Sequence, residues 1–284
     1  MREAGIRPAK SLGQHFLQDR SVVERTVRAA GLGPDDVVIE VGPGLGVMTE
    51  RLVEVSGRVI AVEIDHRLAE RLREQFEGVD RLNVVEADAA RAAPEELLQL
   101  GHANADGPYM MAGNLPYNAG AAIVRNFLEA RHTPRAMVVM LQREVADNMV
   151  AEPGDLGLLG VSVQVYARPK KLFNVPPRAF YPPPKVTSSV VRLDLLTEPL
   201  VRPGEREAFF KVLRAGFSAP RKQLRNTLAQ GLGMNPAGVA AALDAAGIDP
   251  RLRPQQLSVQ DWLRLAKAIP RVEGHGMAVF IEGA

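Results

Sequence analysis

The hexapeptide GNLPYN, residues 113–118, places an amide, a proline and an aromatic ring side by side, between an apolar run and a predicted helix. These residue types suit chemistry on the exocyclic amino group of adenine. Asn114 supplies an amide oxygen and Leu115 a main-chain carbonyl, and two such acceptors can hold both N–H protons and aim the nitrogen at a methyl donor. Pro116 biases Leu115 toward an extended conformation that points this carbonyl outward. Tyr117 offers an aromatic face on which an extruded base can stack.

A glycine-rich loop stands where another predicted strand meets a helix. In IEVGPGLG, glycine recurs at every second position, at Gly42, Gly44 and Gly46, which lets main-chain N–H groups approach a ligand closely. A nicotinamide dinucleotide site normally has the spacing G-x-G-x-x-G, whereas the third glycine here comes one residue early. Glu40 precedes the loop and fits a cationic ligand better than a pyrophosphate.

Two more acidic residues end predicted strands. Glu63 ends RVIAVE and Asp88 ends LNVVEAD, and the carboxyl ends of parallel strands face the ligand crevice of a doubly wound sheet. Glu63 follows Gly42 by 21 residues, the spacing at which an acid meets ribose hydroxyls, and Asp88 is placed to accept from an adenine amino group. A positively charged adenosine is indicated, and S-adenosylmethionine matches it better than NAD. GNLPYN alone is more typical of an ordinary Asx or proline turn with a tyrosine over it, but its position at a fourth strand end of this crevice favours base chemistry.

The elements that position these residues alternate along the chain. From residue 37 to about residue 150, short apolar runs typical of strands alternate with amphipathic stretches of helical length. This alternation predicts a doubly wound, Rossmann-like α/β fold with a mostly parallel sheet and helices on both faces. Residues 161–175 and 185–196 are expected to form two further strands at one edge of the sheet, flanking the proline-rich VPPRAFYPPP.

Strand patterns end near residue 198. Four amphipathic segments separated by glycine and proline follow and predict a small all-helical domain over residues 199–272, after a catalytic domain over residues 1–198. Residues 273–284 form a tail without a usable periodicity. Residues 185–272 carry 14 Lys and Arg against 7 Asp and Glu, a basic excess that suits a phosphate-rich partner or, on the alternative interpretation, a solvated surface in an arginine-rich chain.

Composition narrows the class of protein. The 284-residue chain has no cysteine, which excludes thiolate nucleophiles, structural disulfides and cysteine zinc sites, and its five histidines show no metal-ligand spacing. No metal site is therefore expected. Because the sequence lacks an apolar run of about 18 residues and a signal-peptide pattern, we expect a cytoplasmic protein without membrane contact. No apolar surface stripe is left unassigned, and we expect a monomer.

Together these motifs resemble the ribosomal RNA adenine dimethyltransferase family, the KsgA/RsmA group, over nearly the whole chain. Other matching segments are KSLGQHFL, QREVADNM, VPPRAFYPPPKVTSSVVRL and RKQLRNTL. The resemblance implies a class I methyltransferase sheet and an S-adenosylmethionine site. Many members carry asparagine where His15 stands, and Phe180 resembles the aromatic residue that stacks on the target adenine opposite Tyr117. The residues expected at the cofactor are His15, Leu17, Gly42, Gly44, Glu63, Asp88 and Asn114.

The resemblance also implies N6,N6-dimethylation of two adjacent adenosines in the 3′-terminal hairpin loop of small-subunit (16S) ribosomal RNA, on a pre-30S particle and linked to ribosome biogenesis. Bases in hairpin loops are already partly unstacked, so that they cost less to extrude. Arg221, Lys222 and Arg225, expected along one helix, are predicted to bind RNA phosphates.

Several alternatives stay open. A large-subunit adenine methyltransferase of the macrolide-resistance type would share the chemistry, although AFYPPPKVTSSVVRL and RKQLRNTL favour the small-subunit group. A non-catalytic ribosome-assembly factor is disfavoured by the intact set of acids and by the intact GNLPYN. DNA adenine methyltransferases usually carry a D/N-P-P-Y/F motif, which this sequence lacks, and an NAD oxidoreductase is disfavoured by the glycine spacing.

Overall fold

The computed structural model describes residues 13–270, which fall into two compact units. The first unit holds the described residues up to Ala151 together with Leu159–Pro199. The second holds Glu152–Leu158 and the described residues from Leu200 onward. The predicted tail 273–284 and the first three residues of KSLGQHFL lie outside the described residues.

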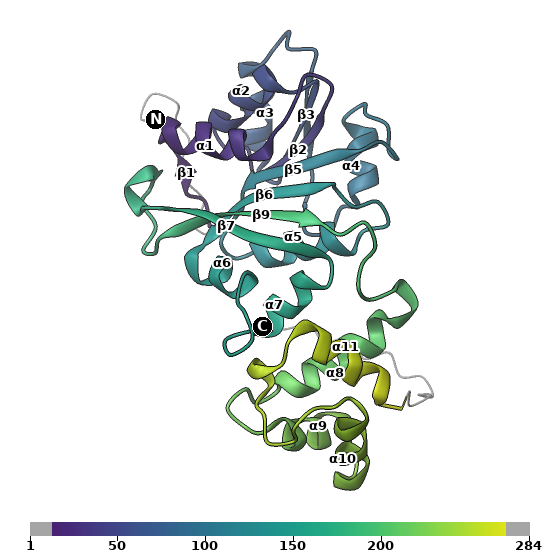
Figure 1. Ribbon diagram of the computed structural model, residues 1–284. Coiled ribbons are helices and arrows are strands. Elements are labelled where there is room, and N and C mark those ends of the chain that lie inside the picture. Colours follow the sequence, from purple (N-terminus) through teal and green to yellow (C-terminus); the bar gives the residue numbers. More distant parts are fainter. Residues whose placement is uncertain (1–12, 271–284) are drawn as a thin grey trace. The chain divides into compact units, whose positions relative to one another are not determined.

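A seven-stranded sheet with the order β4-β3-β2-β5-β6-β9-β7 forms the centre of the first unit (Figure 1). The strands from β2 to β6 pair in parallel, and β9 is antiparallel to both β6 and β7. The order reverses between β2 and β5, and ligands of such sheets bind outside the carboxyl ends of the strands at this switch point. The strands are β2 (Val37–Val41), β3 (Arg58–Glu63), β4 (Leu82–Glu86), β5 (Tyr109–Asn114), β6 (Ala136–Gln142), β7 (Ala167–Val175) and β9 (Ser188–Leu195).

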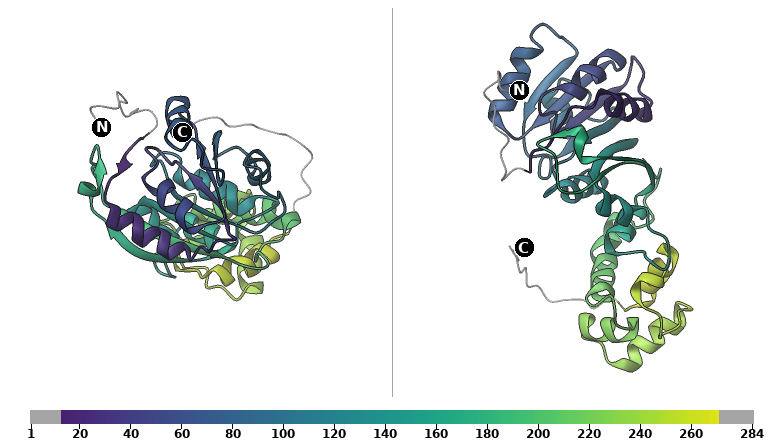
Figure 2. Two further views of the ribbon diagram at one scale, coloured as in Figure 1. Left: turned by 90° about the horizontal axis from the view of Figure 1, so that it is seen from above. Right: turned by 90° about the vertical axis from the view of Figure 1, so that its left-hand side faces the viewer.

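Helices cover both faces of this sheet (Figures 1 and 2). On one face, α1 and α2 share a core cluster with Val38, Met110 and Val138. α4 and α5 lie on the other face. A Cβ added at Gly101, directly after α4, would lie 2.4 Å from Ile60, and one added at Gly120, the first residue of α5, would lie 2.4 Å from Leu141. Ile60 and Leu141 directly follow strand residues of the first face and therefore point to the opposite face. The predicted doubly wound α/β fold is confirmed. The helices are α1 (Arg20–Ala30), α2 (Val47–Val55), α3 (His66–Gln75), α4 (Pro94–Leu100), α5 (Gly120–Glu129), α6 (Arg143–Met149) and α7 (Leu158–Gln164).

The prediction of one strand over residues 161–175 is wrong in its first part. Val161 to Gln164 belong to α7, and β7 begins only at Ala167. A short apolar run rich in valine has the same composition in a buried helix as in a strand, and periodicity does not distinguish the two. The Gln164 side chain fixes the helical end by donating from Nε2 to the carbonyls of Met149 and Ala151, at 3.1 and 2.9 Å.

A two-stranded ribbon joins the beginning of the described chain to the proline-rich segment. β1 (Phe16–Leu17) pairs antiparallel with β8 (Phe180–Tyr181), with Phe16 opposite Tyr181 and Leu17 opposite Phe180. Figure 2 shows the short purple strand β1 beside the green segment that contains β8. Residues 13–17 are thereby brought next to a segment more than 160 positions away in the sequence.

The regular elements of the second unit within the described residues are helices. Trp262 is buried at its centre, where its ring stacks on Phe217 with centroids 5.1 Å apart. The loop Glu152–Leu158 joins this unit because Gly154 N–H donates to the Gln255 carbonyl at 2.8 Å, a pairing that the sequence does not predict. No helix within residues 13–270 is both long and apolar enough to cross a membrane. The helices of this unit are α8 (Arg206–Phe217), α9 (Leu224–Leu232), α10 (Pro236–Ala245) and α11 (Val259–Ala268).

Candidate active site

A cavity of about 540 Å³ opens at the switch point of the sheet. Its wall combines the segment before α1, the glycine loop after β2, the ends of β3 and β4, and the GNLPYN turn after β5. The cavity brings together every residue predicted for the cofactor and for catalysis except Phe180. These residues are His15, Leu17, Gly42, Gly44, Glu63, Asp88, Asn114, Leu115, Pro116 and Tyr117.

The glycine loop is shaped by contacts that only glycine permits. Gly42 has a φ of 71°, and a Cβ at this position would lie 3.1 Å from the Asn114 carbonyl oxygen. Gly44 has a φ of 57°, and its Cβ would lie 3.0 Å from the Phe16 ring. Side chains rarely adopt this left-handed backbone, and here they would also fill the cavity wall. The loop therefore presents backbone to the ligand.

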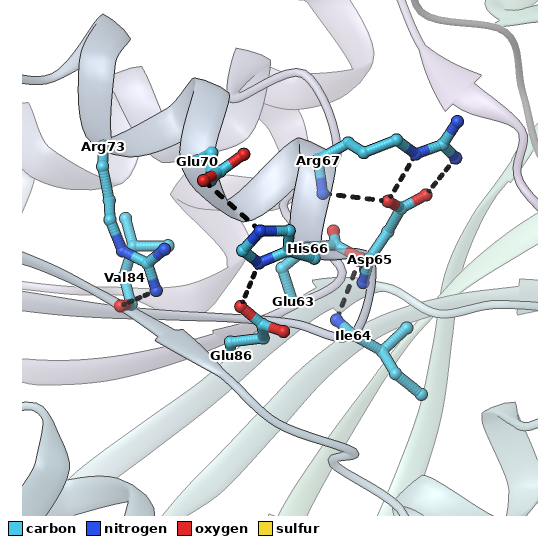
Figure 3. Close-up of polar contacts among 9 residues, drawn as sticks. All are labelled: Glu63, Ile64, Asp65, His66, Arg67, Glu70, Arg73, Val84 and Glu86. Carbon is cyan, nitrogen blue, oxygen red and sulfur yellow. Dashed lines mark hydrogen bonds and ion pairs between the residues drawn. The ribbon is translucent and has the colours of Figure 1, made fainter.

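Glu63 is held at the end of β3 by main-chain donors. Its Oε1 accepts from the N–H groups of Ile64 and Asp65 at 3.0 Å each, and its Oε2 accepts from Gly44 N–H at 3.2 Å. Figure 3 shows this turn at the start of α3, where Asp65 binds Arg67. Burial raises the pKa of the Glu63 carboxyl, and the three donors oppose the shift. The carboxylate is fixed in position before any ligand binds.

Glu40 is a buried carboxyl without a hydrogen bond. It lines the cavity, and neither of its oxygens has a partner among the described residues. Burial raises the pKa of Glu40 to about 8, and the charge of Glu63 adds to this rise. The Thr49 hydroxyl lies close enough to oppose the shift, although its geometry is not that of a hydrogen bond. A buried, unpaired carboxyl is costly, so this site fits a ligand that brings positive charge.

Asn114 and His15 contact each other across the cavity wall. The Asn114 Nδ2 donates to the His15 main-chain carbonyl at 3.0 Å, which leaves Oδ1 as the free end of the amide. The His15 Nδ1 lies 2.7 Å from the Pro182 carbonyl, and because a carbonyl only accepts, Nδ1 carries the proton. The His15 ring also packs against Tyr117, with centroids 5.2 Å apart.

The rest of the GNLPYN turn is fixed from both sides. Leu115 N–H donates to the Met140 carbonyl at 3.1 Å, while no backbone N–H of residues 13–270 donates to the Leu115 carbonyl. The Tyr117 hydroxyl lies 2.6 Å from Ser188 Oγ, and burial raises the pKa of this phenol. The turn thus holds two acceptors and one aromatic ring in a defined arrangement.

The side of the cavity formed by Asp88 and Ile64 is less enclosed. Asp88 Oδ1 accepts from Ala90 N–H at 2.9 Å, and its Oδ2 lies 3.6 Å from Arg91 Nε. Ile64 also lines the cavity, with 51 % of its surface exposed, and the sequence analysis did not identify it. The signal was available, since Ile64 is an apolar residue directly after the strand-end acid Glu63.

Phe180 is not at the cavity. It is only 3 % exposed and packs in the core cluster with Val175 and Ala179. Successive residues of a strand point to opposite faces, so Phe180 faces the core while its neighbour Tyr181 faces solvent. The structure therefore does not bring Phe180 into the cavity with the other predicted residues, and its stacking on the target adenine stays a prediction.

The prediction that Arg221, Lys222 and Arg225 lie along one helix is wrong. α9 begins at Leu224, and Arg221 and Lys222 lie in the preceding turn, directly after Pro220. Proline lacks the N–H that a helix interior requires, so α8 does not continue into α9. All three basic residues are exposed, and their contact with RNA stays a prediction.

Comparison with known proteins places the chain in a family. The family model described as ribosomal RNA adenine dimethylase matches residues 6–270. A curated relative from Dehalococcoides mccartyi is 45% identical over 261 residues, which is 92% of this chain and 88% of the relative. Another from Desulfitobacterium hafniense is 40% identical over 269 residues, or 94% of each chain. Both are named ribosomal RNA small subunit methyltransferase A.

Two solved structures resemble most of the chain. The 23S rRNA methyltransferase ErmE is 30% identical with a TM-score of 0.69, and the match covers 89% of this chain and 99% of ErmE. A dimethyladenosine transferase from Plasmodium falciparum is 24% identical with a TM-score of 0.72, covering 88% of this chain and 96% of that one, and supports the fold. The family model matches residues 6–270 of the chain, and the relative from Dehalococcoides mccartyi is 45% identical over 92% of it. The chain therefore belongs to the ribosomal RNA adenine dimethylase family.

Proposed function

We propose that this protein transfers methyl groups from S-adenosylmethionine to N6 of two adjacent adenosines in the 3′-terminal hairpin loop of small-subunit (16S) ribosomal RNA. It acts as a cytoplasmic monomer on a pre-30S particle. The observation that carries the proposal is the fixed amide of Asn114, whose Oδ1 is the free acceptor in a cavity that also holds the glycine loop and the buried acids.

The cavity suits S-adenosylmethionine in charge and in shape. The unpartnered Glu40 carboxyl favours a ligand with positive charge, and the fixed Glu63 carboxylate is placed for ribose hydroxyls. Asp88 and Ile64 would hold the adenine ring by a polar and an apolar contact. When bound, this cofactor supplies an electrophilic methyl group on a positively charged sulfur.

The GNLPYN turn would activate the target nitrogen by position. The amino group of adenine is a weak nucleophile because its lone pair is conjugated with the ring. Asn114 Oδ1 and the Leu115 carbonyl accept its two N–H groups and favour a tetrahedral nitrogen directed at the methyl group. Tyr117 offers its face to the extruded base. The proton can leave after transfer, so the residues need not include a general base.

The small-subunit substrate is favoured over the large-subunit one. The relatives named as small-subunit methyltransferases are 45% and 40% identical, whereas the 23S enzyme ErmE is 30% identical. The second unit adds the exposed cations Arg221, Lys222 and Arg225, which suit RNA phosphates. The identities support the small subunit as the partner, and the cations support RNA as the substrate.

The test is methyl transfer from labelled S-adenosylmethionine to undermethylated 30S particles, 50S particles and naked ribosomal RNA, followed by separation of the nucleosides. Dimethyladenosine formed on 30S particles alone is the expected result. Label on 50S particles would move the protein to the resistance type of methyltransferase. Tight 30S binding without label on any substrate would make it an assembly factor.

A further inference from the structure

The proline-rich segment between β7 and β9, residues 176–187, borders the proposed site of the target base. The carbonyl of Pro182 in this segment accepts from His15 Nδ1 at 2.7 Å. Ser188, the residue that follows the segment, binds the Tyr117 hydroxyl at 2.6 Å. The His15 and Tyr117 rings also contact each other. The segment is therefore connected to Tyr117, the proposed stacking residue, at Pro182 through His15 and at Ser188 directly.

Tyr181 stands on the exposed side of this segment. It is 48 % exposed and lies opposite Phe16 in the ribbon of β1 and β8. Directly opposed residues of an antiparallel pair share one face, so the Tyr181 ring is on the same face as Phe16. Phe16 lines the cavity and touches the glycine loop at Gly44. An exposed aromatic ring therefore stands on a ribbon whose other strand lines the cavity.

Two cationic residues flank Tyr181 in the sequence. Arg178 and Lys185 are exposed, and neither forms an ion pair within the described part of the chain. Asp19 is near Arg178, whose charge contributes to lowering the pKa of that carboxyl, after the larger effect of the Ser21 hydrogen bond. Aromatic rings between unpaired cations are the composition that binds unpaired nucleic acid strands, through stacking and phosphate contacts.

We propose that Tyr181 stacks on an unpaired nucleotide next to the target adenosine, while Arg178 and Lys185 bind the neighbouring phosphates. This inference rests on the proposed function, because it assumes that the substrate is RNA. Extruding a base costs less when the flanking strand is already held, and a rigid ribbon beside the cavity holds it without further ordering. This role is distinct from the stacking on the target adenine itself that the resemblance implies for Phe180.

The experiment compares Tyr181→Ala, Tyr181→Phe and the control Leu100→Ala in steady-state methylation of undermethylated 30S particles. Leu100 is 60 % exposed and is the last residue of α4. It lies at the end of the sheet where the parallel strands begin, whereas the cavity lies where they end. Loss of stacking is expected to raise KM for the particle about 5- to 100-fold in Tyr181→Ala. Tyr181→Phe keeps the ring and should stay within about twofold of the wild type, as should Leu100→Ala. The affinity for S-adenosylmethionine, measured by calorimetry, should not change in any variant.

A wild-type KM in Tyr181→Ala would overturn the inference. So would a loss of cofactor affinity or of thermal stability that parallels the rise in KM, because Tyr181 would then only support the ribbon. If the wild type itself methylates no RNA, the proposed function fails, and this outcome is distinct from a failure of the Tyr181 role. For the cations, Arg178→Ala with Lys185→Ala should make the negative slope of log affinity against log salt shallower by about 1.4, the effect of two single-strand phosphates. An unchanged slope would show that these two residues do not bind the RNA.

Discussion

The side-chain amide of Asn114 donates to the main-chain carbonyl of His15 at 3.0 Å, across 99 positions of sequence. An amide can present either its oxygen or its nitrogen to a ligand, and this one hydrogen bond selects the oxygen for the cavity. The acceptor that the proposed reaction requires therefore depends on residues 13–17 lying in place over the glycine loop.

Replacing Asn114 by Ala should lower turnover strongly and leave cofactor affinity nearly intact. One of two acceptors for the adenine amino group is lost, and loss of a positioned polar group of this kind typically costs about 10²- to 10³-fold in kcat. The measurement is single-turnover methyl transfer to 30S particles, with S-adenosylmethionine binding followed by calorimetry. Turnover near that of the wild type would sink the proposed mechanism.

The His15 side chain should act on turnover through its neighbours. Its Nδ1 donates to Pro182 and its ring packs on Tyr117, so His15→Ala releases both contacts and should lower kcat about 10- to 100-fold, as small misplacements do. Asparagine offers an N–H donor at a similar distance from the backbone. His15→Asn should therefore recover most of the activity, measured as kcat and KM for 30S particles. Equal losses in both variants would show that the hydrogen bond to Pro182 is irrelevant.

The cations of the second unit should contribute to particle affinity alone. Arg221→Glu with Lys222→Glu places two negative charges in the turn before α9 and should weaken 30S binding, most strongly at low salt, where charges are least screened. Sedimentation with 30S particles at several salt concentrations measures this. Unchanged sedimentation would refute the role, and a change in S-adenosylmethionine affinity would contradict a role confined to particle binding.

The sequence predicts well which strand-end residues line the cavity, because their positions follow from strand order. Gly42, Glu63 and Asn114 each stand at the end of a parallel strand, and such ends meet at one edge of the sheet whatever the side chains between them. The same reasoning does not find the contact of His15 with Asn114 or the pairing of Phe16 with Tyr181. These two contacts depend on where an irregular segment returns to the sheet, and the hydrophobic periodicity of the sequence does not predict that position.

Two of the predictions that differ from the structure share a cause. Phe180 and Tyr181 are adjacent aromatic residues, and only the pairing of β8 with β1 decides which of them is buried. Arg221 and Arg225 have helical spacing, but Pro220 lies just before them and the helix starts later. In both cases a local pattern permits two arrangements, and a single contact or a single proline selects one.

Glu40 makes the unliganded protein sensitive to pH in a defined direction. The pKa of its carboxyl is near 4.5 in an unfolded chain and is raised to about 8 by burial in the folded one. Between these values the folded state holds a proton that the unfolded state has lost. Stability therefore falls as pH rises through this window and levels off above about pH 8.

Glu40→Gln removes this titration and separates stability from binding. The melting temperature of the unliganded variant should match that of the wild type near pH 5 and exceed it increasingly up to pH 8, because glutamine never has to ionise in the buried site. A positively charged ligand favours the ionised carboxyl, so S-adenosylmethionine should bind the wild type more tightly as pH rises toward 8 and should release a proton on binding. Calorimetry in two buffers of different ionisation enthalpy detects that proton, and Glu40→Gln should release less of it and bind more weakly. If both proteins release the same number of protons, Glu40 is not the group that meets the charge of the cofactor.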